Sequence, residues 1–283
     1  MSRHGTTARS LLARLVAGAR GGTRPTHPTA GAVSRGPGSS ERGADHLSPA
    51  DAPDDRERAS LCRSLLAGVA ARLSADPRGL SPRAVERALS AMATVPRDRF
   101  VPGASLAAAY EDRPLSIGRR QTISQPTVVA RMTALLDLGP SDRVLEVGTG
   151  CGYQTAVLAR LAGTVHSVER IRALAATAAA RLGALGLTGI ELAVRDGAEG
   201  WPEHAPFDAI IVTAAAPGVP PALLRQLAEP GRMVIPVDLS GHGLTQELLY
   251  VVKQAGGAVE RTPIAEVAFV PLLRGVDEPE PGA

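Results

Sequence analysis

The residues with the clearest chemical potential lie in a glycine-rich segment near the middle of the chain. Residues 144–154 read VLEVGTGCGYQ, an apolar run followed by Gly148, Gly150 and Gly152. This pattern predicts a buried strand, a tight turn and the start of a helix. Glycines let the backbone approach a ligand closely, and the free N–H groups at a helix start favour an anionic group. The segment is therefore a candidate cofactor-binding loop.

Acidic residues accompany three successive apolar runs. Glu146 precedes the glycine turn, Glu169 closes the next apolar run, and Asp196 with Gly197 follows the one after. A carboxylate about 20 residues beyond a glycine loop commonly holds a ribose diol, and the third is placed to face an adenine amino group. The Gly-x-Gly-x-Gly spacing differs from the Gly-x-Gly-x-x-Gly of dinucleotide binders. Together these residues indicate S-adenosylmethionine, whose methionine end carries both an ammonium and a carboxylate.

The distribution of charge and aromatic residues argues against nucleic acid as a partner. Residues 1–40 contain six Arg and no Asp or Glu, so the remainder carries 25 basic against 28 acidic residues. A nucleic-acid interface needs a basic face and often aromatic residues for base stacking, and the chain has only seven aromatic residues.

Metal and membrane binding are not expected either. Cys62 and Cys151 are too few for a disulfide framework or a metal cluster, and the six histidines show no zinc-binding spacing. His166 alternates within an apolar run and is expected to be a packed or edge residue. No apolar stretch reaches the roughly 18 residues that span a bilayer. We therefore expect a cytoplasmic monomer without metal or membrane association.

Composition divides the chain into three parts. Residues 1–53, rich in Arg, Gly, Pro and Ser, are expected to be a disordered basic extension, although the acid-free start would also suit an organelle transit peptide. Residues 54–275 form the expected ordered domain, and residues 276–283 an acidic disordered tail.

Within the domain, helical periodicity is followed by an alternation of strands and helices. This order predicts an α/β fold, a doubly wound Rossmann-like sheet with helices on both faces and an N-terminal helical cap, with its ligand at the carboxyl ends of the strands. Ser81 and Ser124 are expected helix caps, and residues 100–123 are expected to be mostly loop. Helices are predicted over residues 57–73, 82–93, 126–136, 170–185 and 220–227, and strands over 144–147, 164–168, 190–194, 208–213, 231–236, 246–252 and 266–270.

Several segments, in order between about residues 60 and 275, resemble protein-L-isoaspartate O-methyltransferases. The QTISQP segment is the most specific of them, whereas the glycine loop indicates a methyltransferase in general. The segments are YEDRPL (110–115), QTISQP (121–126), GTGCGYQ (148–154), GWP (200–202), PFDAIIVTAA (206–215), MVIPV (233–237) and FVPL (269–272).

The resemblance implies an enzyme that methylates the free α-carboxylate of L-isoaspartyl residues in damaged proteins, which starts their repair through a succinimide. Ser124 would lie at the active site, Glu169 would bind the ribose hydroxyls beside Arg170, and Gln246 would belong to a cofactor lid. The other residues implied are Gln121, Thr122 and Ile123 beside the cofactor, Gly148, Thr149 and Gly150 around its methionine moiety, and Asp196 and Gly197 at its adenine.

This chemistry needs no general base, because the acceptor carboxylate, with an ordinary pKa of about 3.5, is already ionised at neutral pH. Alignment alone can supply roughly 7–11 kcal/mol. Ser124 is expected to orient the acceptor and to cap the following helix. Three positions depart from the family pattern and put the peptide preference in doubt: the pair Arg119–Arg120, Thr127 and Ala268.

Three alternatives remain open from the sequence. The same fold could methylate a carboxylate of another peptide or of a small molecule. A nicotinamide-dependent oxidoreductase would use the glycine loop differently, although the loop spacing counts against it. A binding module without catalytic activity is the third.

Overall fold

The computed structural model describes residues 55–241 and 245–277. The predicted extension over residues 1–53 and the last six residues of the predicted tail lie outside this range. The backbone forms two compact units, Met1–Ser60 and Leu61–Ala283, and the second contains the whole sheet. Within the described residues, no helix has the length and apolar character needed to cross a membrane.

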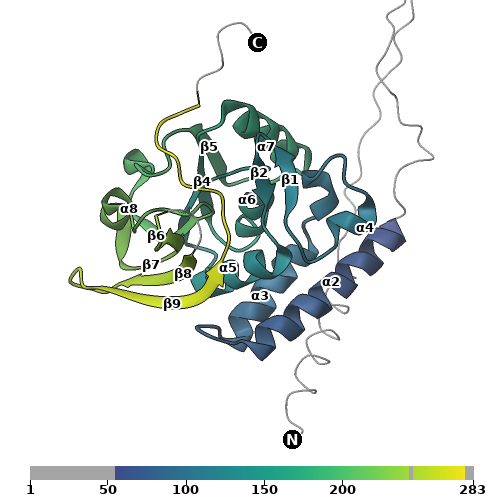
Figure 1. Ribbon diagram of the computed structural model, residues 1–283, viewed down its shortest axis with the longest axis horizontal. Coiled ribbons are helices and arrows are strands. Elements are labelled where there is room, and N and C mark those ends of the chain that lie inside the picture. The colour runs from purple at the N-terminus through teal and green to yellow at the C-terminus, as the bar shows by residue number, and fades with distance from the viewer. Residues whose placement is uncertain (1–54, 242–244, 278–283) are drawn as a thin grey trace, which may run out of the picture. The chain divides into compact units, whose positions relative to one another are not determined.

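A seven-stranded sheet forms the centre of the second unit, with the order β5-β4-β3-β6-β7-β8-β9 (Figure 1). The strands β5, β4, β3, β6 and β7 run parallel to one another, and β8 and β9 complete the sheet in antiparallel orientation beside β7. The chain order reverses at β3 and β6, which is where ligands bind in doubly wound sheets. The strands are β3 (Arg143–Val147), β4 (Thr164–Glu169), β5 (Ile190–Val194), β6 (Phe207–Val212), β7 (Leu227–Asp238), β8 (Gln246–Lys253) and β9 (Val259–Val267).

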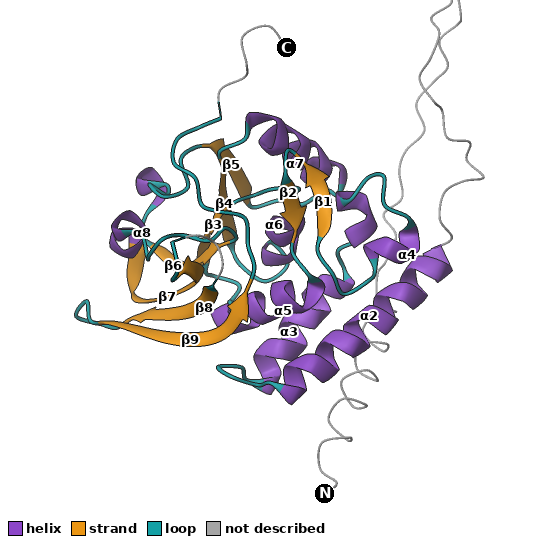
Figure 2. Ribbon diagram, viewed as in Figure 1, coloured by secondary structure: helices purple, strands orange, loops and turns teal. Residues whose placement is uncertain are grey.

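The helices confirm the predicted alternation, with ends that differ by a few residues (Figure 2). The Ser81 hydroxyl accepts the Ala84 N–H at 3.1 Å, so this predicted cap is confirmed. The helices are α2 (Asp55–Ala75), α3 (Pro82–Ala93), α4 (Leu106–Ala109), α5 (Pro126–Leu136), α6 (Tyr153–Leu158), α7 (Arg172–Ala184) and α8 (Pro221–Gln226), with short 3-10 helices η2 (Arg97–Phe100) and η3 (Pro202–His204).

Alternating side chains of the central strands build two separate cores, one on each face of the sheet. Val144 packs in one core with α5 residues such as Met132 and Leu136. Its neighbour Leu145 packs in the other with Leu223 of α8. This alternation follows from the period of two in a strand, and it explains why the central strands are almost continuously apolar.

The last strand differs from its prediction. The structure places β9 at Val259–Val267, not at 266–270, and Phe269 and Val270 lie beyond the sheet. The prediction was wrong because β9 is an edge strand with mostly exposed polar residues and contains Pro263, and proline is tolerated only at such edges. At the start of the predicted tail, the Asp277 N–H donates to the Arg170 carbonyl at 2.9 Å.

Residues 100–123 contain more structure than predicted. Besides α4, they hold the antiparallel hairpin of β1 (Leu115–Gly118) and β2 (Gln121–Ile123). Arg119 and Arg120 form its turn and have φ values of 51° and 57°. Two-residue turns with positive φ usually carry Gly or Asn, so this arginine pair occupies a backbone conformation that such side chains rarely adopt.

Helix α5 is capped by a residue from outside its own segment. The Asp112 carboxylate accepts the Thr127 N–H at 2.8 Å, the Thr127 hydroxyl at 2.7 Å and the Gln125 amide at 3.1 Å. Gln125 occupies the N-cap position without a side-chain hydrogen bond to the helix, so the predicted capping role of Ser124 was wrong. The same contacts give Thr127, one of the departures from the family pattern, a structural role.

We predict that Asp112→Ala lowers the free energy of unfolding by about 1–2 kcal/mol, because it removes the cap of α5. Chemical denaturation measures this change. Glu111→Ala is the matched control, since Glu111 is exposed and pairs only with its neighbour Arg113 among the described residues, so its substitution should change stability by less than about 0.5 kcal/mol. Equal effects of the two substitutions would contradict the capping role.

Candidate active site

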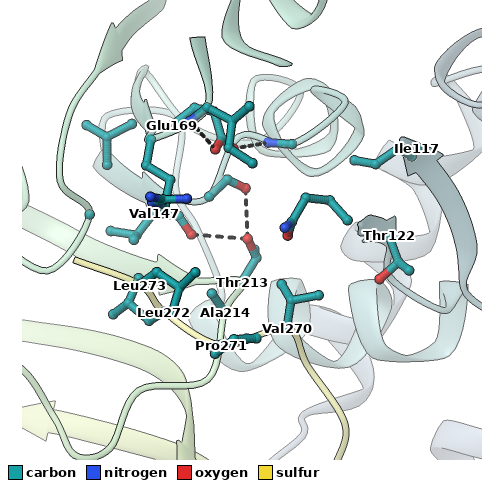
Figure 3. A pocket seen from close by; sticks show the side chains of 17 residues that line it. Ile117, Thr122, Val147, Glu169, Thr213, Ala214, Val270, Pro271, Leu272 and Leu273 are labelled. Atoms are coloured by element: carbon teal, nitrogen blue, oxygen red, sulfur yellow. Dashed lines mark hydrogen bonds between the residues drawn. The ribbon is translucent and has the colours of Figure 1, made fainter. Parts of the chain in front are cut away.

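A pocket lies at the carboxyl ends of β3, β4 and β6 (Figure 3). Ile117 and Thr122 of the hairpin lie on one side, and Leu272 and Leu273 of the C-terminal segment lie across from them. Glu169 lies at the upper end in this view. The remaining lining residues are Gln121, Val147, Gly148, Gly150, Val168, Arg170, Ile171, Gly197, Thr213, Ala214, Val270 and Pro271.

The glycine loop is held against the end of β6 at a distance that excludes a side chain. Gly148 has a φ of 96°, and its N–H donates to the Val168 carbonyl at 2.8 Å. The Thr213 hydroxyl donates to the Gly148 carbonyl at 2.8 Å. A Cβ at Gly148 would lie 2.4 Å from the Thr213 hydroxyl oxygen. Both the backbone conformation and the close approach therefore require glycine.

Glu169 links the glycine loop to the start of helix α7. One carboxylate oxygen accepts the Gly150 N–H at 2.8 Å, and the other accepts the Ile171 N–H at 2.9 Å. The side chain is buried but lines the pocket. A carboxylate offers about four acceptor positions, so two remain for a ligand with paired hydroxyl groups, such as a ribose.

Glu146 supports the loop from behind. It does not line the pocket, and it is fully buried. Its Oε2 accepts the Thr155 hydroxyl at 2.5 Å and the Ser167 hydroxyl at 2.6 Å, and Ser167 in turn lies 2.6 Å from the Thr149 hydroxyl. Burial raises its pKa to about 8, against the two hydroxyl groups, which lower it.

Other residues singled out in the sequence also contact the backbone around the pocket. The Asp196 carboxylate accepts the N–H groups of Ala198 and Gly275, at 2.9 and 2.8 Å. The Gln246 amide makes two hydrogen bonds, of 2.7 and 3.0 Å, with the main chain of Phe269. Neither residue lines the pocket, but Phe269, which Gln246 holds, lies just before the lining segment 270–273.

A second hollow leads from the glycine loop to Ser124. Gly148, Gly150, Thr122 and Thr213 line both this hollow and the pocket. It also contains two of the predicted site residues, Ile123 and Thr149.

Ser124 lies where this second hollow meets an outer groove, which is lined mainly by Pro114, Gln125, Val128 and residues 266–270. The Ser124 hydroxyl has no hydrogen-bond partner among the described residues. Its backbone is fixed by the buried Arg97 guanidinium, which donates to the Ser124 carbonyl at 2.9 Å. The same side chain donates to the Ala109 carbonyl at 3.1 Å and lies 5.1 Å from the Tyr153 ring centre.

Sequence reasoning missed several lining residues. Thr213 closes the apolar run of β6, and its position at a strand end was a usable signal. Ile117 falls in the region predicted to be loop, Val270 ends the predicted strand 266–270, and residues 269–272 form one of the segments that carry the family resemblance. The structure attaches this segment to the end of β6, because Ala215 donates to the Val270 carbonyl at 2.8 Å and accepts the Leu272 N–H at 2.7 Å.

Comparison with known families identifies the architecture. Residues 81–277 match the family model described as protein-L-isoaspartate(D-aspartate) O-methyltransferase. The chain belongs to this family. A protein-L-isoaspartate O-methyltransferase 2 of Syntrophobacter fumaroxidans is 49% identical over 229 residues, which cover 80% of this chain and 90% of the relative. One from Halorhodospira halophila is 56% identical over 191 residues, covering 67% and 85%.

Solved structures of protein-L-isoaspartate O-methyltransferases share the fold. One is 28% identical, with a TM-score of 0.63 over 76% of this chain and 65% of its own. Another, the putative enzyme from Plasmodium falciparum in complex with S-adenosyl-L-homocysteine, is 24% identical, with a TM-score of 0.61 over 74% and 97%. The predicted fold class and family are therefore confirmed.

The donor set fits S-adenosylmethionine, the methyl donor of the family. Glu169 retains acceptor positions toward the pocket, the glycine loop presents its main chain, and Ile117 and Leu272 provide apolar walls. The predicted contacts of each residue with the cofactor stay predictions at this point.

The raised pKa of Glu146 predicts a pH-dependent stability. Because the folded pKa of about 8 exceeds the ordinary value of 4.5, the protonated group favours folding. This contribution is complete below pH 4.5 and is lost as the pH rises through 8. Glutamine does not titrate, so Glu146→Gln should gain stability relative to the wild type with rising pH, by at most about 1.4 kcal/mol per pH unit.

Denaturation of both proteins at pH 5 and pH 8 measures this difference. Glu260→Gln, on the exposed edge of β9, controls for the loss of one negative charge. A stability difference between the wild type and Glu146→Gln that stays the same at the two pH values would show that the buried group is ionised.

Proposed function

We propose that this protein transfers the methyl group of S-adenosylmethionine to the free α-carboxylate of L-isoaspartyl residues in damaged proteins, and so starts their repair through a succinimide. The observation that carries this proposal is the continuity of the three hollows, with Thr122 and Thr213 lining all of them. A donor in the pocket would meet an acceptor from the groove beside Ser124. Family membership supports the reaction.

The inner pocket holds the donor in this proposal. Gly148, Thr149 and Gly150 surround the methionine moiety, and Gln121, Thr122 and Ile123 border it from the hairpin side. Glu169 accepts hydrogen bonds from the ribose hydroxyls beside Arg170, and Gly197 lies at the adenine. Glu146, Asp196 and Gln246 support the donor site without contacting the donor. Glu146 fixes the glycine loop, Asp196 fixes the turn at residues 196–198, and Gln246 fixes the segment that begins at Phe269.

The outer groove holds the acceptor. Its walls are apolar at Val128, Val267 and Phe269 and polar at Ser124 and Gln125, which suits a peptide whose backbone and side chains must both be placed. The Ser124 hydroxyl donates a hydrogen bond to one acceptor oxygen and turns the other toward the donor methyl. Since an α-carboxylate is ionised at neutral pH, Ser124 needs no basic partner.

The donor supplies a methyl group on a positively charged sulfur, which a carboxylate oxygen can displace directly. The carbon–sulfur bond breaks as the new carbon–oxygen bond forms, and the sulfur retains the electron pair. The protein contributes alignment and the exclusion of water. One chain supplies all residues of the three hollows, so the proposed reaction requires no second copy. The free thiols of Cys62 and Cys151 suit a reducing compartment such as the cytoplasm.

We predict that Glu169→Gln weakens S-adenosylmethionine binding by about 10- to 100-fold, because it replaces charge-assisted hydrogen bonds to the ribose. Isothermal titration calorimetry measures the dissociation constant. Glu266→Gln, in the outer groove, is the matched control and should bind the donor like the wild type. Unchanged binding by Glu169→Gln would remove Glu169 from the cofactor site.

The acceptor is tested with two synthetic peptides that differ only in the linkage of one residue. An isoaspartyl peptide should accept labelled methyl groups, and the matching aspartyl peptide should accept few. Ser124→Ala should lower kcat/KM for the isoaspartyl peptide by about 10- to 100-fold, the effect expected for one lost hydrogen bond to a charged group, without changing donor affinity. Equal labelling of both peptides would refute the specificity, and a much faster unrelated carboxylate acceptor would favour the alternative of another substrate on the same fold.

A further inference from the structure

A cluster of two histidines and a glutamate lies at the other end of β4 from the cofactor pocket. His166 of β4 and Glu191 of β5 are cross-strand neighbours in the parallel register, and His204 ends the short helix η3. His166 is three residues before Glu169, about 10 Å along the strand. The cluster is therefore separate from the three hollows that the proposed reaction uses.

The donor atoms of this cluster face one another. The His166 Nε2 lies 3.9 Å from one carboxylate oxygen of Glu191, and the His204 Nε2 lies 3.6 Å from the other. All the candidate donor atoms are within 4.8 Å of one another. A tetrahedral Zn²⁺ with bonds of about 2.0–2.2 Å separates its ligands by about 3.3–3.5 Å, so donor atoms that are now up to 4.8 Å apart must approach one another by at most about 1.5 Å.

One of the three candidate ligands is held rigidly, and the other two are exposed enough to move toward it. His166 is fixed, because its side chain is only 5% exposed and packs edge-on against Trp201 and Phe207 with ring centres 5.6 and 5.5 Å away. The Glu191 side chain is 60% exposed and the His204 side chain 31%. These two can therefore move onto an ion anchored by His166, and a fourth position would face solvent.

The buried imidazole of His166 also lacks partners. Its Nδ1 is buried without a hydrogen-bond partner among the described residues, and 3.9 Å from its Nε2 to Glu191 exceeds hydrogen-bond length. Buried polar atoms are normally paired. Ligation through Nε2 would give that nitrogen a partner, while Nδ1 would carry the ring proton.

The charges around the cluster are of both signs. Glu191 supplies the negative charge that a divalent ion needs, although Arg143, whose guanidinium donates to the His204 carbonyl at 2.6 Å, works against it.

We propose that His166, Glu191 and His204 bind a divalent transition-metal ion of the zinc type, which ties the edge strand β5 and helix η3 to β4. Two imidazoles and one carboxylate favour Zn²⁺ over Mg²⁺, which prefers oxygen ligands. The expectation of no metal site rested on sequence spacing, and these three residues are 25 and 13 positions apart.

Titration of the metal-free full chain with zinc sulfate tests the proposal. The wild type should bind one Zn²⁺ at least tenfold more tightly than Glu191→Gln or His204→Gln. Glu203→Gln is the matched control, because Glu203 is the exposed neighbour of His204 and pairs with Arg195, and it should bind Zn²⁺ like the wild type. Cysteines, and histidines elsewhere in the chain, contribute equally in all four proteins, so the difference isolates the cluster.

Thermal unfolding gives a second readout. Zinc at about 100 times its dissociation constant should raise the Tm of the wild type by about 5–10 °C, and should raise that of Glu191→Gln clearly less. Magnesium should produce no such shift, and affinity for S-adenosylmethionine should be the same in all variants. Equal zinc binding by the wild type, Glu191→Gln and His204→Gln, or an equal shift with magnesium, would overturn the proposal.

Discussion

The position of the glycine loop depends on two carboxylates that neighbouring strands hold on either side of it. Glu169 accepts the Gly150 N–H from the pocket side, and Glu146 reaches Thr149 from behind through Ser167. A glycine-rich backbone loses much conformational entropy on ordering, so it needs fixed hydrogen-bond partners, and the two carboxyl groups hold the loop in this way. Supporting the loop from the side opposite the pocket places Glu146 in a fully buried position, and this burial raises its pKa.

Segments far apart in the chain complete the site around this loop. The hairpin of β1 and β2 contributes Ile117 and Thr122. The C-terminal segment contributes residues 270–273, which follow β9 and lie outside the sheet. Each has its own attachment: Arg97 holds the Ser124 carbonyl below the hairpin, and Ala215 pairs with both Val270 and Leu272. The pocket is thus formed where three separate segments meet, and none of them could form it alone.

The sequence predicted the parts of this arrangement that depend on local chemistry. The apolar runs of β3, β4 and β6 and the glycine loop follow from hydrophobic patterning and from residues that permit positive φ, and Glu169 follows from its place after the next strand. The cap of α5 was not predictable, because Asp112 approaches it from 15 residues away. For the same reason, residues 270–273 became lining residues only through their hydrogen bonds with the distant Ala215.

Strand β4 shows how a buried strand can carry polar groups when each has a partner. Its last four residues are all buried, and two of them are polar and paired: Ser167 with Glu146 and Thr149, and Glu169 with two backbone N–H groups. Since an unpaired buried polar group costs free energy, the strand is stable only if the protein supplies these acceptors and donors. His166 stands just before them, equally buried, and has no comparable partner among the described residues. Aromatic packing against Trp201 and Phe207 holds the ring but leaves its buried Nδ1 without a hydrogen bond within the described part of the chain, so the strand tolerates one unpaired polar atom where large rings pack closely around it.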